Sequence, residues 1–110
     1  MKQRNDAVYV NDILESINLI VNYVQDKSEF EFSTNLLLQD AVIRRFEIIG
    51  EAASKISNEF KLTHLSIEWG LMKDMRNKLI HEYFGISANT IYQTIQRDLP
   101  LLKDKLEKLV

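Results

Sequence analysis

Apolar side chains recur at three- and four-residue steps along most of the chain, and this spacing places them on one face of an α-helix. Four blocks carry the repeat, and they predict helices over about residues 6–25, 35–58, 67–84 and from 88 onward. One proline and three glycines in 110 residues leave these helices few interruptions. With short connections between them, the sequence predicts an all-α four-helix bundle that forms a single domain over residues 1–110.

Local signals between the blocks set further expectations. Ser28 and Glu31 have the spacing of a capping box, which predicts a short helical turn between the first two long helices. Residues 58–65 show no periodic pattern and are predicted to form a connector. Pro100 lacks a backbone N–H, so the last helix should kink or break near residues 98–99.

Aromatic and apolar residues define the expected core around the third helix. Trp69 is assigned to the core rather than to a platform for stacking bases, and Phe30 and Phe32 are also expected in the core. Ser66 is the expected N-cap of the third helix, and Gly85 is its expected left-handed stop. The apolar stripe of this helix is predicted to consist of Leu71, Met72, Met75, Leu79 and Tyr83.

The second predicted helix is apolar around much of its circumference. Its main stripe is widened by further apolar residues, namely Leu37, Ala41, Ile48 and Ala52. A helix buried on two sides needs two partners, such as its own bundle and another subunit. Gly50 costs this helix about 1 kcal/mol relative to alanine. We therefore expect Gly50 to have a packing reason, because a small residue permits close approach of another helix.

Arg76 and His81 lie on opposite sides of one strip of the third helix when successive residues are placed about 100° apart. The strip between them consists of Lys73, Asn77, Ile80 and Phe84. A plain amphipathic helix would be polar throughout on this side, whereas the strip combines two apolar residues with a cation and an amide. We therefore expect it to face a groove rather than solvent.

The spacing R-x-x-x-x-H-x-Y at Arg76, His81 and Tyr83 resembles the signature of HEPN-domain ribonucleases, and more closely that of the HepT-like toxins of toxin–antitoxin pairs. The resemblance covers nearly the whole chain. Further matches follow in order at residues 40–45, 47–52, 69, 75–77, 81–85 and 98–100. The resemblance implies an antiparallel bundle whose last helix is kinked or broken near Pro100. It also implies the toxin of a type VII-like system with RNA as its substrate.

The residues of the strip suit RNA cleavage. An imidazole at His81 can move protons near neutral pH, and the guanidinium of Arg76 matches a phosphate. Asn77 is predicted to assist by orienting the imidazole or bonding a phosphate oxygen, and Lys73 is the best placed lysine for a phosphate contact. No metal and no cofactor is expected. Because one histidine cannot easily serve as both acid and base, we expect a two-fold homodimer in which both copies of Arg76 and His81 surround one cleft.

The resemblance also implies a partner, a cognate minimal nucleotidyltransferase antitoxin. This enzyme would transfer AMP from ATP onto Tyr83. The adduct would add bulk and negative charge beside Arg76, where an RNA phosphate must bind. From the residues alone, the favoured interpretation of Tyr83 is a tyrosine at the edge of the core.

Charge and composition exclude several classes of protein. The formal net charge of −2 argues against non-specific coating of nucleic acid, and no DNA partner is expected. The absence of cysteine excludes disulfides and thiol chemistry. No apolar run reaches membrane-spanning length and residues 1–6 lack a signal-peptide core, so we expect a cytoplasmic protein without a membrane partner.

Structural alternatives remain open at this stage. Arg76 could pair with Glu51 or Asp74, and His81 could be a hydrogen-bonded interface residue. Glu51 is interpreted as a structural partner of an arginine rather than as a catalytic acid. The rival to a ribonuclease is a catalytically inactive helical module that dimerises, binds nucleotide and binds a nucleotidyltransferase partner.

Overall fold

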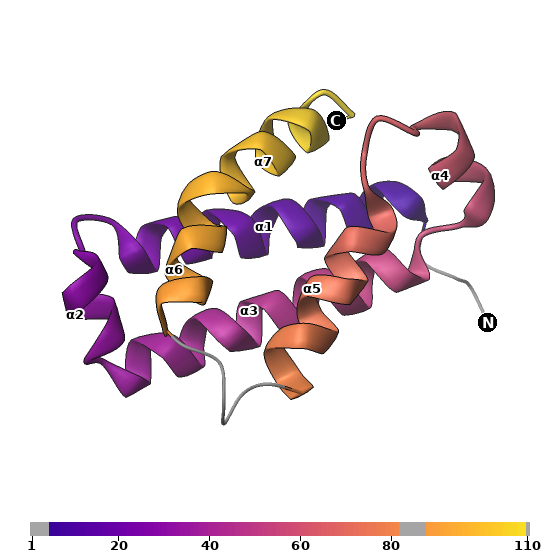
Figure 1. Cartoon of the computed structure of the whole chain (residues 1–110). Helices are drawn as coiled ribbons and strands as arrows, with labels where there is room; N and C mark the ends of the chain where they lie inside the picture. Colours follow the sequence, from indigo (N-terminus) through magenta and orange to yellow (C-terminus); the bar gives the residue numbers. More distant parts are fainter. Residues whose placement is uncertain (1–4, 82–87, 110) are drawn as a thin grey trace.

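The computed structural model describes residues 5–81 and 88–109, with the backbone alone for residues 78–81 (Figure 1). Within those ranges every regular element is a helix, which confirms the all-α class. The helices are α1 (Asp6–Val24), α2 (Glu29–Ser33), α3 (Leu36–Lys55), α4 (Asn58–Thr63), α5 (Trp69–His81), α6 (Ala88–Arg97) and α7 (Leu99–Glu107). None of the helices in these ranges is long and apolar enough to cross a membrane.

The helix α3 lies at the centre of the arrangement. It packs against α1 on one side and against α5 on another, and these are the two most extensive helix contacts. Figure 1 shows α1 and α3 side by side in opposite directions, with α2 at one end of the pair and α4 at the other. The α6 and α7 helices then return along the molecule, where α6 contacts α2 and α7 contacts α1.

The predicted apolar stripes form one core. Its largest side chains with almost no exposure are Phe32, Phe46, Ile13, Ile17, Ile20, Ile49, Met72, Ile91, Leu99, Leu106, Val10 and Val42. Trp69 is also buried, as expected. Leu71 differs from the expected stripe, because 48% of it is exposed beside α7.

The predicted helix boundaries at the capping box and at Pro100 are confirmed. The Ser28 Oγ accepts from the Glu31 N–H and the Ser28 N–H donates to the Glu31 carboxylate, both at 3.0 Å. The hydrogen bond from the Ser28 N–H is the main cause that lowers the pKa of the Glu31 carboxyl, and the Ser28 side chain lowers this pKa further. Near Pro100, α6 ends at Arg97 and α7 begins at Leu99, which places the proline in a first turn that needs no proline N–H.

Two expectations near the start of α5 are wrong. Residues expected to form a connector include the helix α4, whose N-cap Ser57 accepts from the Phe60 N–H at 3.1 Å. A six-residue helix is too short for a periodic pattern, and its cap stabilises it instead. Ser66 is not an N-cap, because α5 begins only at Trp69, after the buried Ile67.

One aromatic assignment in α2 is also wrong. Phe32 is fully buried, whereas 74% of Phe30 is exposed. Two residues apart on a helix point to nearly opposite sides, so a short helix that buries one of the pair leaves the other outside.

This difference predicts unequal effects on stability. Replacing buried Phe32 by alanine should lower the free energy of unfolding by about 3–5 kcal/mol, because it removes a core side chain. The matched change Phe30→Ala should alter it by about 0.5 kcal/mol or less. Urea denaturation of both variants measures the difference, and equal losses would contradict the burial of Phe32 alone.

Candidate active site

Gly50 of α3 allows α5 to approach closely. A Cβ placed on Gly50 would lie 2.6 Å from the Cβ of Arg76, 2.8 Å from its Cδ and 3.0 Å from its Cγ. The Cβ of Arg76 is fixed to the α5 backbone, so no rotation of the side chain relieves the shortest contact. The expected packing reason for Gly50 is thereby confirmed: the aliphatic stem of Arg76 lies over it.

The guanidinium of Arg76 is bonded to its neighbour in sequence. Its Nε and Nη2 donate to the Oδ1 of Asn77 at 3.1 and 2.8 Å, and both residues are half-buried. One edge of the planar group is thereby fixed on Asn77. The guanidinium carries five N–H donors, and those of Nη1 are directed away from the amide. Arg76 is therefore oriented at two points, by Gly50 along its stem and by Asn77 at its head.

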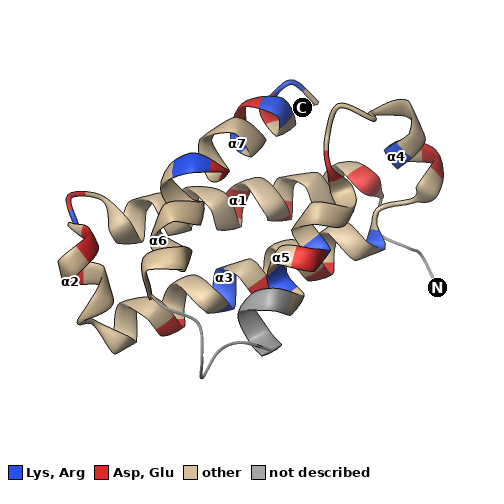
Figure 2. Ribbon diagram, in the orientation of Figure 1, with Lys and Arg blue, Asp and Glu red and all other residues tan. Residues whose placement is uncertain are grey.

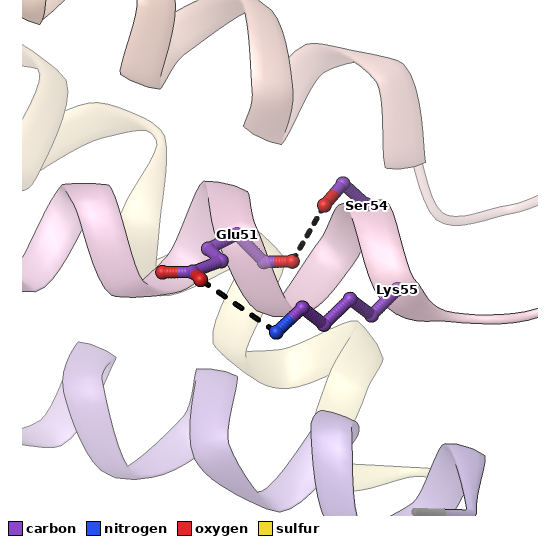
Figure 3. Close-up of polar contacts among 3 residues, drawn as sticks. All are labelled: Glu51, Ser54 and Lys55. Atoms are coloured by element: carbon purple, nitrogen blue, oxygen red, sulfur yellow. Dashed lines mark hydrogen bonds and ion pairs between the residues drawn. The ribbon is translucent and has the colours of Figure 1, made fainter. Parts of the chain in front are cut away.

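The suggested ion pairs of Arg76 are not formed. Among the described residues, no ion pair joins Arg76 to Glu51 or to Asp74. The carboxylate of Glu51 instead lies 3.6 Å from the Nζ of Lys55, and the Ser54 Oγ donates to the Glu51 carbonyl at 2.7 Å (Figure 3). Glu51 lies about 100° around α3 from Gly50, on the side of the helix that also carries Glu47 and Arg44, and Lys55 is its partner there.

The remaining residues of the strip are placed only in part. Lys73 is exposed one turn before Asn77, on the same side of α5. His81 is the last residue of α5, about 7.5 Å along the helix axis from Arg76 at 1.5 Å per residue. The side chains of His81 and Ile80, together with all of Tyr83 and Phe84, lie outside the described residues. The structure therefore brings Arg76 and Asn77 together and places the His81 backbone on the same helix.

A further cation, Arg44, lies on α3, and no role was predicted for it from the sequence. The Nη1 of Arg44 is 3.6 Å from the carboxylate of Glu47, and these side chains are 63% and 38% exposed. Both residues fall within the stretch that matches the family pattern, and this was the available signal. Figure 2 shows cationic and anionic residues interspersed along the helices. Any binding of phosphate must therefore use a few positioned cations rather than a broad basic face.

The comparisons with known proteins agree on one family. The family model described as Ribonuclease HepT-like matches residues 13–109. A Thermococcus cleftensis protein named "Probable ribonuclease HepT" is 43% identical over 107 residues, which cover 97% of each chain. A Methanocaldococcus jannaschii protein named "Gamma-glutamylcyclotransferase and putative RNase" is 44% identical over 108 residues, 98% of this chain and 49% of that protein. The chain thus spans about half the length of that second relative. No solved structure matches the chain.

The close approach at Gly50 predicts a loss of stability on a small substitution. Gly50→Ala should push α5 away at a cost of about 1–3 kcal/mol, which outweighs the gain of about 1 kcal/mol in helix propensity. The control is Gly70→Ala in α5, where an added Cβ meets nothing within 4 Å. Thermal denaturation should show a lower midpoint for the first variant and an equal or higher one for the second. Equal midpoints would mean that the Gly50 contact does not constrain α5.

Proposed function

This chain belongs to the HepT-like family of ribonucleases, and we propose on that premise that it is a toxin that cleaves cytoplasmic RNA internally without a metal ion. The observation that carries the proposal is the double fixing of Arg76 by Gly50 and Asn77, on the helix that ends at His81. A guanidinium held in this way can receive a phosphate without first being ordered, which lowers the entropic cost of binding the reacting group.

The proposed reaction is transfer within the RNA strand. A base removes the proton of a 2′-hydroxyl, whose oxygen attacks the adjacent phosphorus as the bond to the 5′-oxygen breaks. An acid protonates that leaving oxygen, so the products are a cyclic phosphate and a free 5′-hydroxyl. His81 is assigned the proton transfers, and Arg76 stabilises the charge that develops on the phosphate. Asn77 supports Arg76, and Lys73 is proposed to contact a further phosphate.

A homodimer would supply the second histidine that this reaction needs. Apolar residues remain uncovered on the outer side of α3: 81% of Leu37 is exposed, and Ala41 and Ile48 are only half-buried. Leu36 at the start of α3 and Phe30 of α2 are further uncovered apolar residues, each 74% exposed. Such a surface suits a second copy of the chain, because a two-fold interface brings the same patch of both copies together. Ala52 does not contribute to it, because only 6% of this residue is exposed.

Tyr83 is proposed as the site of regulation. Its modification with AMP by a minimal nucleotidyltransferase antitoxin would place a negative phosphate seven residues along the chain from Arg76. The negative charge would compete with RNA for the guanidinium and silence the toxin.

The net charge of −2 favours a second candidate, a catalytically inactive dimerisation module. Its Arg76 and His81 would contact nucleotide or the nucleotidyltransferase rather than RNA. The two candidates differ in one observable property, the cleavage of RNA by the purified protein.

Loss of either catalytic group should nearly abolish cleavage. His81→Ala and Arg76→Ala should each lower the rate about 10²–10⁴-fold, because each removes a group that acts in the transition state. The matched control is His64→Ala, since the His64 ring packs on Phe60 with centroids 4.4 Å apart, outside the proposed site. The assay is cleavage of total RNA by unmodified protein, with and without EDTA, beside the melting temperature of each variant. A wild type that cuts nothing would establish the inactive module, and variants that lose activity only by unfolding would make both residues structural.

Modification should depend on Tyr83 alone. Incubation with the cognate nucleotidyltransferase and ATP should add adenylate mass to the peptide that carries Tyr83, and Tyr83→Phe should prevent it. Tyr92 is a suitable internal comparison, because its hydroxyl already donates to the Lys27 carbonyl at 2.8 Å and its ring packs on Phe32. Mass spectrometry locates the adduct, and adenylate on Tyr92 would refute the assignment.

A further inference from the structure

The ion pair between Arg44 and Glu47 stands beside the Arg76 contact. Viewed down α3 from Gly50, Glu47 lies about 60° around the helix, Arg44 about 120° and Ile48 about 160°. Arg44 therefore occupies the surface between the Gly50 contact with α5 and the uncovered apolar side of α3. It lies six residues from Gly50, about 9 Å along the axis.

This position distinguishes Arg44 from other surface cations, because it lies close to the proposed site and is exposed to solvent. If two copies meet on the apolar side of α3, as proposed, Arg44 lies at the border between that interface and the side of α3 that carries the Gly50 contact with Arg76. Its side chain is 63% exposed, so its guanidinium can be reached from solvent. Among the described ion pairs, the one that includes Arg44 joins its Nη1 to the Glu47 carboxylate at 3.6 Å.

We propose that Arg44 binds a phosphate of single-stranded RNA next to the scissile phosphate, and that Glu47 holds the guanidinium until the substrate replaces it. This inference rests on the proposed ribonuclease function and extends it to substrate binding. A phosphate can take two parallel N–H donors of arginine, whereas the exposed pair at 3.6 Å is long and screened by solvent. We therefore expect the Arg44 guanidinium to leave Glu47 and bind the RNA phosphate.

A single strand is the substrate that this arrangement fits. Arg44 of α3 and Arg76 of α5 lie on two helices in contact, and Arg44 is about 9 Å along α3 from Gly50, over which the stem of Arg76 lies. One extended strand can therefore offer neighbouring phosphates to both. The chain has a net charge of −2 and its charges are interspersed, so a few positioned cations rather than a broad basic face must hold the RNA. A duplex would need contacts spread over two grooves.

The test compares two similar ion pairs. On α7, Lys108 and Asp104 form an exposed pair at 3.7 Å, with side chains 75% and 73% exposed, and they serve as the matched control. Binding of a 2′-O-methyl RNA oligonucleotide, which cannot be cleaved, is measured by fluorescence anisotropy at several salt concentrations. Arg44→Gln should weaken binding and reduce the slope of log affinity against log salt by about 0.7, the value for one phosphate of a single strand. Lys108→Gln should leave the slope unchanged.

Removal of the Glu47 carboxylate should change RNA affinity in the direction opposite to removal of Arg44. A pair with only a structural role would not show this opposition. Glu47→Gln should tighten binding of the oligonucleotide, because it removes the competitor for Arg44, whereas Asp104→Asn should not. With cleavable RNA, Arg44→Gln should raise KM and leave kcat near that of the wild type.

The outcomes separate this inference from the proposed function. If the wild type cleaves RNA but Arg44→Gln keeps its salt slope, or if Glu47→Gln and Arg44→Gln both weaken binding, the role of Arg44 is refuted and the ribonuclease stands. If the wild type neither binds nor cleaves RNA, the role of Arg44 and the proposed ribonuclease function are both refuted.

Discussion

The close contact between Gly50 of α3 and the stem of Arg76 of α5 lies within one of the two most extensive helix contacts of the described residues. It sets how near α5 can lie to the central helix, and it also determines where a guanidinium stands. A lysine at position 76 could place a charge there, but it could not offer a planar fork both to Asn77 and to the phosphate that we propose Arg76 binds. The Arg76 side chain must thus both fit between two helices and present its guanidinium. The absence of a Cβ at Gly50 leaves the space that the first requirement needs.

The long helices could be predicted from the sequence because their apolar residues repeat over several turns. The breaks at Ser28 and Pro100 were also predictable, since capping and the missing proline N–H act locally. The helix α4 could not be found in this way, because six residues do not complete two turns and its stability comes from the Ser57 cap and the packing of Phe60. Which of two nearby phenylalanines enters the core depends on where α2 docks, and periodicity carries no such information.

Some features of the candidate site could be predicted from the sequence and others could not. Helical angles placed Arg76 between the apolar stripe and a mixed strip, and the small size of Gly50 indicated a close helix contact. The hydrogen bonds from Arg76 to Asn77 were not predictable, because adjacent helix residues do not ordinarily face each other. Glu51 was assigned to an arginine by charge alone, whereas its partner in the structure is Lys55, one turn further along α3. Angles around one helix give directions, but distances between helices come only from packing.

If one cleft uses His81 from both copies of the chain, as proposed, mixing wild-type and variant subunits should reveal it. Wild-type and His81→Ala chains are unfolded and refolded together in varied proportions, and the RNA cleavage rate is measured at constant total protein. If both histidines are needed, only dimers of two wild-type chains are active, so an equal mixture should retain about one quarter of the wild-type rate. A rate that falls in simple proportion to the wild-type fraction, to about one half in the equal mixture, would show that each chain acts alone and would contradict the composite site.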